Sequence, residues 1–205
     1  MSTSESERTP RPSATAQRIE KTALDLFYER GFKSTTVREI ALACGLTPGA
    51  LYNHFPSKDA LLSSMMMRGH EDLLRRLDEA LAKAGHDPRE ELQAVARSHA
   101  LFHTEYQKGA RVASQEIDAL LEPDRSKVTA LRQRGRQILV DILERGRRTG
   151  LFQIPDTGAV ANEILTMGVG ISGWFQPEAR LSAEEVASLH ADLVLRIVGV
   201  GIDST

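Results

Sequence analysis

Residues 47–58 read TPGALYNHFPSK, a pattern that predicts a very short helix between two helix breakers. Pro48 and Gly49 stand at its start, and Phe-Pro-Ser-Lys closes it. An ordinary core helix has no use for Tyr52, His54 and Lys58 at this spacing, because buried polar groups need partners. We therefore interpret these side chains as contacts for a partner outside the chain.

A second short helix precedes this one. Thr36 comes directly before VREIALAC, Glu39 completes a capping box, and Gly45 ends the helix. An apolar face is expected to pack inward, formed by Ile40, Ala41, Leu46 and Leu51. Two short helices joined by a tight turn make a helix-turn-helix, whose second helix enters the major groove of DNA.

The second helix of this motif has the side chains that a DNA partner requires. Small residues at its start let the backbone approach the base edges: Thr47, Pro48, Gly49 and Ala50. Tyr52, His54 and Lys58 carry donors that can reach phosphate oxygens. The alternative for Tyr52 is a place in the core, which is where we expect Phe55.

The run TTVREIALACGLTPGALYNHFPSKDALL, residues 35–62, resembles the DNA-binding signature of the TetR family of transcriptional regulators. The resemblance extends without a gap over about residues 14–62. It implies a dimeric, ligand-controlled repressor whose first three helices bind an operator. By position it implies phosphate contacts for Thr36, Thr47, Tyr52, His54 and Lys58, and contact with or approach to bases for Arg38, Pro48, Gly49 and Ala50. Ala50 stands where threonine is common, so one hydroxyl contact is missing.

Composition and charge fit this reading. The 205 residues are 41% hydrophobic and 26% charged, and only 5% are aromatic, which argues against an all-β fold. Residues 8–58 hold eight basic and four acidic side chains, which gives a charge of +4. Because the net charge of the whole chain is -2, the remaining residues carry -6. This asymmetry favours a phosphate-binding head over an interaction module that has lost DNA binding. A single cysteine, Cys44, and a polar start without a signal peptide indicate a cytoplasmic protein.

We expect an all-α protein with a disordered arm at 1–13, a helix-turn-helix domain at 14–56 and a ligand-binding and dimerisation domain at 57–205. Arg8 and Arg11 of the arm either reach a minor groove or are simply solvated. The first helix begins after Ser13 and stops at Gly31. Later helices are predicted at 57–84, 88–106, 109–121, 124–149, 157–174 and 183–200.

The helix at 88–106 places two histidines on its buried face, together with apolar and aromatic residues: Leu92, Val95, His99, Phe102, His103 and Tyr106. Core histidines with satisfied partners are one explanation. The other is that they supply the polar contacts of an apolar ligand pocket. The i,i+4 spacing also allows a metal-dependent hydrolase, but a third ligand is lacking, so we expect neither metal nor cofactor.

Arg132 lies near the edge of the buried stripe of the helix at 124–149. It either forms a structural ion pair or binds an anionic ligand group. The segment GWFQPEARLSAEEVASLHADLVLRIVG, residues 173–199, resembles the C-terminal end of TetR members that control fatty-acid or steroid-ring degradation. Their effectors are acyl-CoA thioesters, and we add Trp174 of this segment to the expected ligand-binding residues.

The last two helices carry wide apolar stripes for the end of a chain. The first stripe contains Val160, Ile164, Gly168 and Ile171, with further glycines at 170 and 173, and the second contains Val186, Leu189, Leu193, Ile197 and Val198. Two copies of this pair would bury both stripes in a four-helix bundle. The alternative is that both helices complete the core of a monomer.

Overall fold

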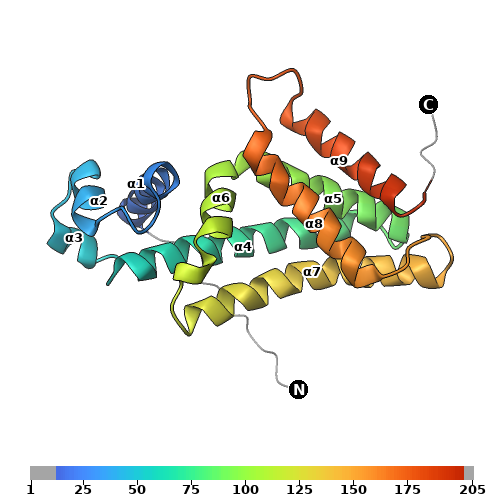
Figure 1. The fold of residues 1–205 in the computed structure, drawn as a ribbon, viewed down its shortest axis with the longest axis horizontal. Helices are drawn as coiled ribbons and strands as arrows, with labels where there is room; N and C mark the ends of the chain where they lie inside the picture. Colours follow the sequence, from blue (N-terminus) through green and yellow to red (C-terminus); the bar gives the residue numbers. More distant parts are fainter. Residues whose placement is uncertain (1–12, 201–205) are drawn as a thin grey trace. The chain divides into compact units, whose positions relative to one another are not determined.

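The computed structural model describes residues 13–200, and every regular element in that range is helical (Figure 1). The predicted all-α class is confirmed. The expected arm at 1–13, with Arg8 and Arg11, lies outside the described residues except for Ser13. The elements are α1 (Ala14–Arg30), α2 (Val37–Ala43), α3 (Pro48–Tyr52), α4 (Lys58–Lys83), α5 (Pro88–Glu105), α6 (Gln107–Gln115), the 3-10 helix η1 (Ile117–Ala119), α7 (Asp124–Arg148), α8 (Thr157–Trp174) and α9 (Ala183–Ile197). None of the described helices is both long and apolar enough to span a membrane.

Hydrogen bonds at the helix ends explain why most helices begin where the sequence predicts. The side chain of Ser13 accepts an amide hydrogen bond from the first turn of α1. The predicted capping boxes of Thr36 with Glu39 and of Ser182 with Glu185 are both present. In each box the cap hydroxyl accepts a hydrogen bond from the backbone amide of the glutamate, and the glutamate carboxylate accepts one from the backbone amide of the cap residue. Both amides would otherwise lack partners at the helix start.

One predicted helix is shorter than expected. The sequence pattern suggested a helix over residues 109–121, but α6 ends at Gln115 and Glu116 has non-helical backbone angles (φ -110°, ψ 14°). Leu120 is buried just beyond this break, with 4% of its surface exposed. Tertiary packing therefore overrides local helix propensity at this point.

The chain divides into two compact units, which we call the head and the body. The head ends at Leu61 and the body begins at Leu62, whereas the sequence analysis placed the boundary between residues 56 and 57. Helix α4 starts in the head and continues through the body. The head contains α1, α2 and α3, and the body contains the helices from α5 onward.

The head has its own small core, which holds the helix-turn-helix together. Ile19 of α1, Ile40 of α2 and Leu51 of α3 are fully buried, and Phe55 is 7% exposed, as predicted. The turn between α2 and α3 passes through Gly45, whose φ of 66° is a conformation that favours glycine. The expected inward face is confirmed except for Leu46, which is only half-buried.

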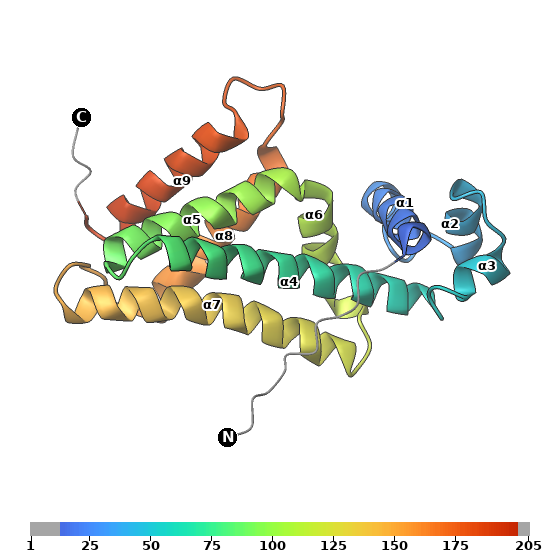
Figure 2. The ribbon, with the colours of Figure 1, turned by 180° about the vertical axis from the view of Figure 1, so that it is seen from behind.

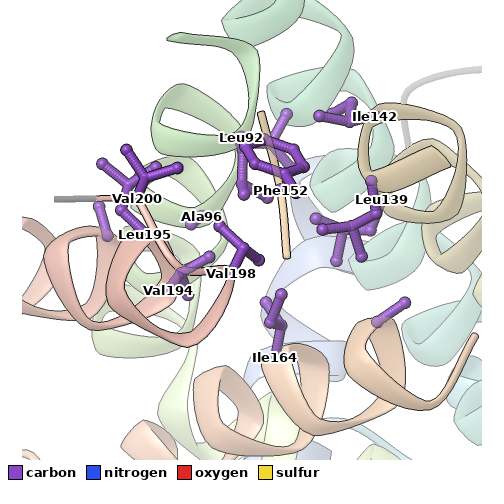
Figure 3. Packing of buried hydrophobic residues seen from close by; sticks show 14 of the residues in the cluster. Leu92, Ala96, Leu139, Ile142, Phe152, Ile164, Val194, Leu195, Val198 and Val200 are labelled. Carbon is purple, nitrogen blue, oxygen red and sulfur yellow. The ribbon is translucent and has the colours of Figure 1, made fainter. Parts of the chain in front are cut away.

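The body is built around α5, which packs against α7, α8 and α9 (Figure 1, Figure 2). Figure 3 shows Leu92, Leu139, Ile164 and Val194, one from each of these four helices, pointing toward one another beside Phe152. All five side chains are at most 2% exposed. This dense apolar cluster fixes the positions of the helices that carry the polar residues described below.

Candidate DNA-binding face and effector site

Helix α3 buries one of its residues and exposes three of the other four, with Ala50 half-buried. Leu51 is fully buried, whereas Tyr52 is 49% exposed. Pro48, Gly49 and His54 are also exposed. The core position considered for Tyr52 is therefore wrong, and the exposed surface of α3 has the small start and polar end that the sequence predicted.

The threonines of the head have a structural role at the helix starts. The hydroxyl of Thr47 accepts a hydrogen bond from the amide of Ala50 at 3.2 Å. The hydroxyl of Thr36 donates to Oε2 of Glu39 at 2.7 Å. Both threonines remain exposed, so capping leaves them accessible to a partner. Arg38 is exposed as well, and its side chain makes no hydrogen bond or ion pair with any residue in the range 13–200.

Lys58 does not have the outward position that we expected. Its Nζ donates to the carbonyl oxygens of Phe32 at 2.7 Å and Thr35 at 2.8 Å. The same ammonium lies 4.3 Å from the centroid of the Phe32 ring, a cation–π distance. Lys58 therefore ties the start of α4 to the segment between α1 and α2, and its positive charge is used inside the head.

Three buried histidines form a cluster in the body. His99 and His103 of α5 face inward, as predicted, and their Nε2 atoms are 3.3 Å apart. His190 of α9 joins them, with its ring centroid 6.5 Å from that of His99. His190 was not among the residues predicted from sequence, although it lies at helical spacing between the buried Val186 and Val194. Only one of the two facing Nε2 atoms can carry a proton, so the pair fixes opposite tautomers.

The cluster is neutral at physiological pH. Burial lowers the pKa of His103 and His190 to about 4, and neighbouring histidines add to the effect for His103. Burial also lowers the pKa of His99 well below its ordinary value. Nδ1 of His99, Nδ1 of His103 and Nε2 of His190 have no hydrogen-bond partner within the described part of the chain. Among those residues no group of three or more His, Cys, Asp or Glu side chains could hold a metal ion.

Gly168 of α8 makes room for this cluster. A Cβ at that position would lie 2.2 Å from Nδ1 of His99, far inside contact distance. We therefore predict that Gly168→Ala displaces the imidazole and lowers the free energy of unfolding by about 1–3 kcal/mol, measured by urea unfolding.

The matched control is Gly135→Ala on α7, where the new Cβ would meet Leu74 at an ordinary 3.6 Å. Because alanine favours helix more than glycine does, this control is expected to leave stability unchanged or slightly raised. Equal destabilisation by the two variants would contradict the packing described for His99.

Aromatic residues connect the histidines to α4 and α6. The ring of Phe102 lies 5.3 Å from the rings of both His103 and Tyr106. The Tyr106 ring occupies the space beside Gly69 of α4 and Gly109 of α6, where added Cβ atoms would come within 2.9 Å and 2.0 Å of it. Burial raises the pKa of Tyr106, and the Arg68 charge opposes that shift. His99, Phe102, His103 and Tyr106 thus lie next to one another, as the sequence suggested.

Arg132 bridges helices instead of forming the structural ion pair that we considered. Its Nε donates to Nε2 of His70 on α4 at 3.1 Å, and Nη2 donates to the carbonyl of Ala113 on α6 at 2.7 Å. Trp174 also differs from expectation, because it is 57% exposed at the end of α8. Such exposure does not fit the lining of a closed pocket.

The two apolar stripes of the last helices divide between core and surface. Ile164, Gly168 and Ile171 of α8 are buried in the body itself, and so are Val186 of α9 and Val198 just after its end. The other members of the second stripe remain exposed: Leu189 (48%), Leu193 (40%) and Ile197 (45%). On α8, Gly170 and Gly173 are exposed, and a Cβ at either position would meet nothing within 4 Å.

The head and the body match two parts of one family. Residues 19–65 match the family described as bacterial regulatory proteins, tetR family, and residues 85–198 match the tetracyclin repressor-like C-terminal domain. A helix-turn-helix head followed by a helical body defines a DNA-binding regulator. The chain belongs to the TetR family of transcriptional regulators, which are DNA-binding proteins and not enzymes.

Relatives of known name or structure cover most of the chain. It is 31% identical to the HTH-type transcriptional repressor KstR2 of Mycobacterium tuberculosis, over 84% of this chain and 87% of the relative. A tetR-family regulatory protein from Rhodococcus RHA1 superposes with a TM-score of 0.86 at 27% identity, over 93% of this chain and 100% of that one. The structure of AibR in complex with isovaleryl coenzyme A and operator DNA superposes with a TM-score of 0.80 at 26% identity. This match covers 91% of this chain and 100% of that one.

Proposed function

We propose that the protein is a homodimeric cytoplasmic repressor that binds a palindromic operator and is released from it by a small hydrophobic effector of the acyl-CoA type. In this proposal the two α3 helices enter successive major grooves about one DNA turn apart, roughly 34–36 Å. The effector binds in the body and favours a different spacing. The effector can shift the equilibrium between the two spacings only through the difference in its affinity for them.

The open space around Gly49 in α3 is the observation that best supports DNA binding by this helix. A Cβ added there would approach nothing closer than 4.0 Å, where it meets the Thr47 hydroxyl. The backbone at Gly49 also lacks the positive φ that would favour glycine. Glycine costs up to about 1 kcal/mol relative to alanine in a helix, and no contact in the described part of the head offsets that cost at Gly49. A DNA backbone or base edge that approaches α3 closely accounts for it.

The proposed dimer uses the exposed surface of α8 and α9. Leu189, Leu193 and Ile197 lie one turn apart on α9, and scattered exposure of single apolar residues would not produce such a row. Gly170 of α8 leaves space for the helix of a second copy to approach. Trp174 adds an exposed aromatic ring at the end of α8, of the kind that often anchors an interface.

The proposed effector site lies in the body near His103 and Tyr106. Buried polar nitrogens beside the Phe102 ring offer a few directed contacts in an apolar setting, which is how ligand pockets are lined. AibR, which this chain resembles over most of its length, has been seen with isovaleryl coenzyme A and operator DNA together. This relative supports an acyl-CoA thioester as the class of effector.

A titration of operator DNA tests the DNA-binding face. Arg38→Ala is expected to weaken binding to the DNA upstream of the protein's own gene by about 10–100-fold, because a cation at the groove is lost. The slope of the logarithm of the binding constant against the logarithm of the salt concentration should also become shallower by about one, because one cation is lost from the interface.

The control for this titration is Arg148→Ala, which removes an arginine with 68% of its side chain exposed on the body. That variant should bind like the wild type at every salt concentration. If both variants bind alike, Arg38 does not contact the DNA.

A further inference from the structure

Arg132 joins three helices of the body through one guanidinium group. It extends from α7, donates to His70 of α4 through Nε, and donates to the Ala113 carbonyl of α6 through Nη2. Its side chain is half-buried. Helices α4 and α7 are also linked on either side of this bridge, by Ser63 with Asp124 at 2.7 Å and by Asp78 with Arg134 at 3.0 Å.

The partner on α4 has a defined tautomer. Nδ1 of His70 lies 2.8 Å from the carbonyl oxygen of Met66, one turn earlier in the same helix, and must donate to it. Nε2 therefore carries a lone pair and accepts from Arg132. Burial lowers the pKa of His70, and the Arg132 charge adds to this effect, so the imidazole stays neutral.

Arg132 differs from the neighbouring arginine in having no acidic partner among residues 13–200. Arg134, two residues further along α7, pairs with Asp78. Both acceptors of Arg132 are neutral, and it forms no ion pair with any carboxylate in the described range 13–200. A guanidinium bound to an oxyanion makes hydrogen bonds about twice as strong as those to neutral acceptors. Within the described residues, no carboxylate thus compensates the charge of Arg132.

This inference rests on the proposed control of DNA binding by an effector. We infer that Arg132 is the anion-binding residue of the effector site, and that an oxyanion of the effector, a carboxylate or a phosphate, takes the guanidinium away from His70 and Ala113. The exchange frees α4 from α6 and α7 at this level. Helix α4 begins at Lys58, which is held by two carbonyls of the head, so a shift of α4 changes the position of its own first turn.

The surroundings of Arg132 favour an amphiphile over a simple ion. Gly69, the residue before His70 on α4, lies against the Tyr106 ring, and Phe102 contacts both Tyr106 and His103. An acyl chain or ring would therefore lie along the Phe102 and Tyr106 side, with its anionic end at Arg132. His103 offers its unpartnered Nδ1 to a neutral polar group between the two ends.

The first test follows His70 by ¹⁵N NMR in the wild-type protein. The spectrum of the free protein is expected to show the tautomer protonated on Nδ1. Addition of sodium decanoate or decyl phosphate should shift the Nε2 signal as its donor leaves, and 1-decanol, the neutral match, should not. An Nε2-protonated free form, or a signal that neither anion moves, would refute the exchange.

The second test uses Arg132→Gln, checked for wild-type helicity by circular dichroism. Both decanoate and decyl phosphate should weaken wild-type binding to the upstream DNA at least tenfold more than 1-decanol does. In Arg132→Gln that preference for the anions should vanish, and comparison of the two probes separates a carboxylate site from a phosphate site. An undiminished preference in the variant overturns the inference.

The two tests keep this inference separate from the proposed function. A wild-type protein that does not bind the upstream DNA contradicts the repressor proposal. The NMR titration still decides whether Arg132 exchanges His70 for an anion.

Discussion

Leu193→Glu is expected to convert the proposed dimer into monomers. Leu193 is the middle residue of the exposed row on α9 and is 40% exposed in the single chain. In a two-fold symmetric interface, residues near the axis meet their own copies, so the substitution places two like charges together in an apolar environment. Such a pair costs several kcal/mol, and about 4 kcal/mol corresponds to a thousandfold weaker association.

The loss of the dimer should reduce operator affinity by a similar factor. Two heads held in one dimer bind the second half-site as an intramolecular step, and a monomer loses that advantage. Sedimentation at micromolar concentration measures the assembly state, and a titration with the upstream DNA measures affinity. The head of the variant is unchanged in sequence, so weak binding to a single half-site should remain.

Leu121→Glu is the matched control, because Leu121 is also an exposed leucine of the body, at 66%. It lies between η1 and α7, outside the proposed interface. This variant should sediment as a dimer and bind DNA normally. Persistence of the dimer in Leu193→Glu would show that the row on α9 is not the interface.

The body is expected to lose stability steeply as the pH falls below about 6.5. The folded pKa of His103 and of His190 is about 4, whereas an unfolded histidine has a pKa near 6.5. The unfolded chain therefore takes up protons first, and the free energy of unfolding decreases from about pH 6.5 until the pH reaches about 4. Each of these two histidines accounts for about 3 kcal/mol over this range, and His99 adds to the loss.

Several carboxylates have a lowered pKa, but they do not obscure this effect. Their contribution to stability is lost as the pH falls through their folded pKa, which lies below the ordinary 4.5 of glutamate. Between about pH 6.5 and 5 the slope belongs mainly to the histidines, at about 1.4 kcal/mol per pH unit for each proton taken up.

Urea unfolding at a series of pH values, followed by circular dichroism, measures that slope. His190→Gln should make the slope of the free energy of unfolding against pH shallower by the uptake of about one proton, whatever the effect of the substitution on stability at neutral pH. His86→Gln, at an exposed histidine of the body, should leave the slope unchanged. A slope equal to wild type in His190→Gln would contradict the buried neutral cluster.

The helices could be predicted from sequence because their causes are local. Ser13, Thr36 and Ser182 cap helices through contacts within a few residues, and the buried faces repeat at helical spacing. The outward position of Tyr52 and the inward position of His99 and His103 follow from the same periodicity. The end of α6 could not be predicted in this way, because Glu116 leaves the helix where tertiary packing requires it.

The contacts of the site depend on residues far apart in the chain, and periodicity cannot supply them. Lys58 meets carbonyls that precede it by 26 and 23 residues, which reverses its expected outward role. Arg132 meets His70 across 62 residues. His190 joins His99 only because α9 packs on α5. Trp174, which we included among the expected ligand-binding residues, is exposed at the end of α8.

Hydroxyl-radical footprinting of the upstream DNA tests the central claim most directly, namely that two heads read one duplex from outward-facing α3 helices. We expect two protected half-sites of inverted sequence, with centres about one helical turn apart on the same face of the DNA. Protection should be clearly weaker in Arg38→Ala at a protein concentration that just saturates the wild type. A single unpaired site, or protection that Arg38→Ala leaves intact, would contradict this account.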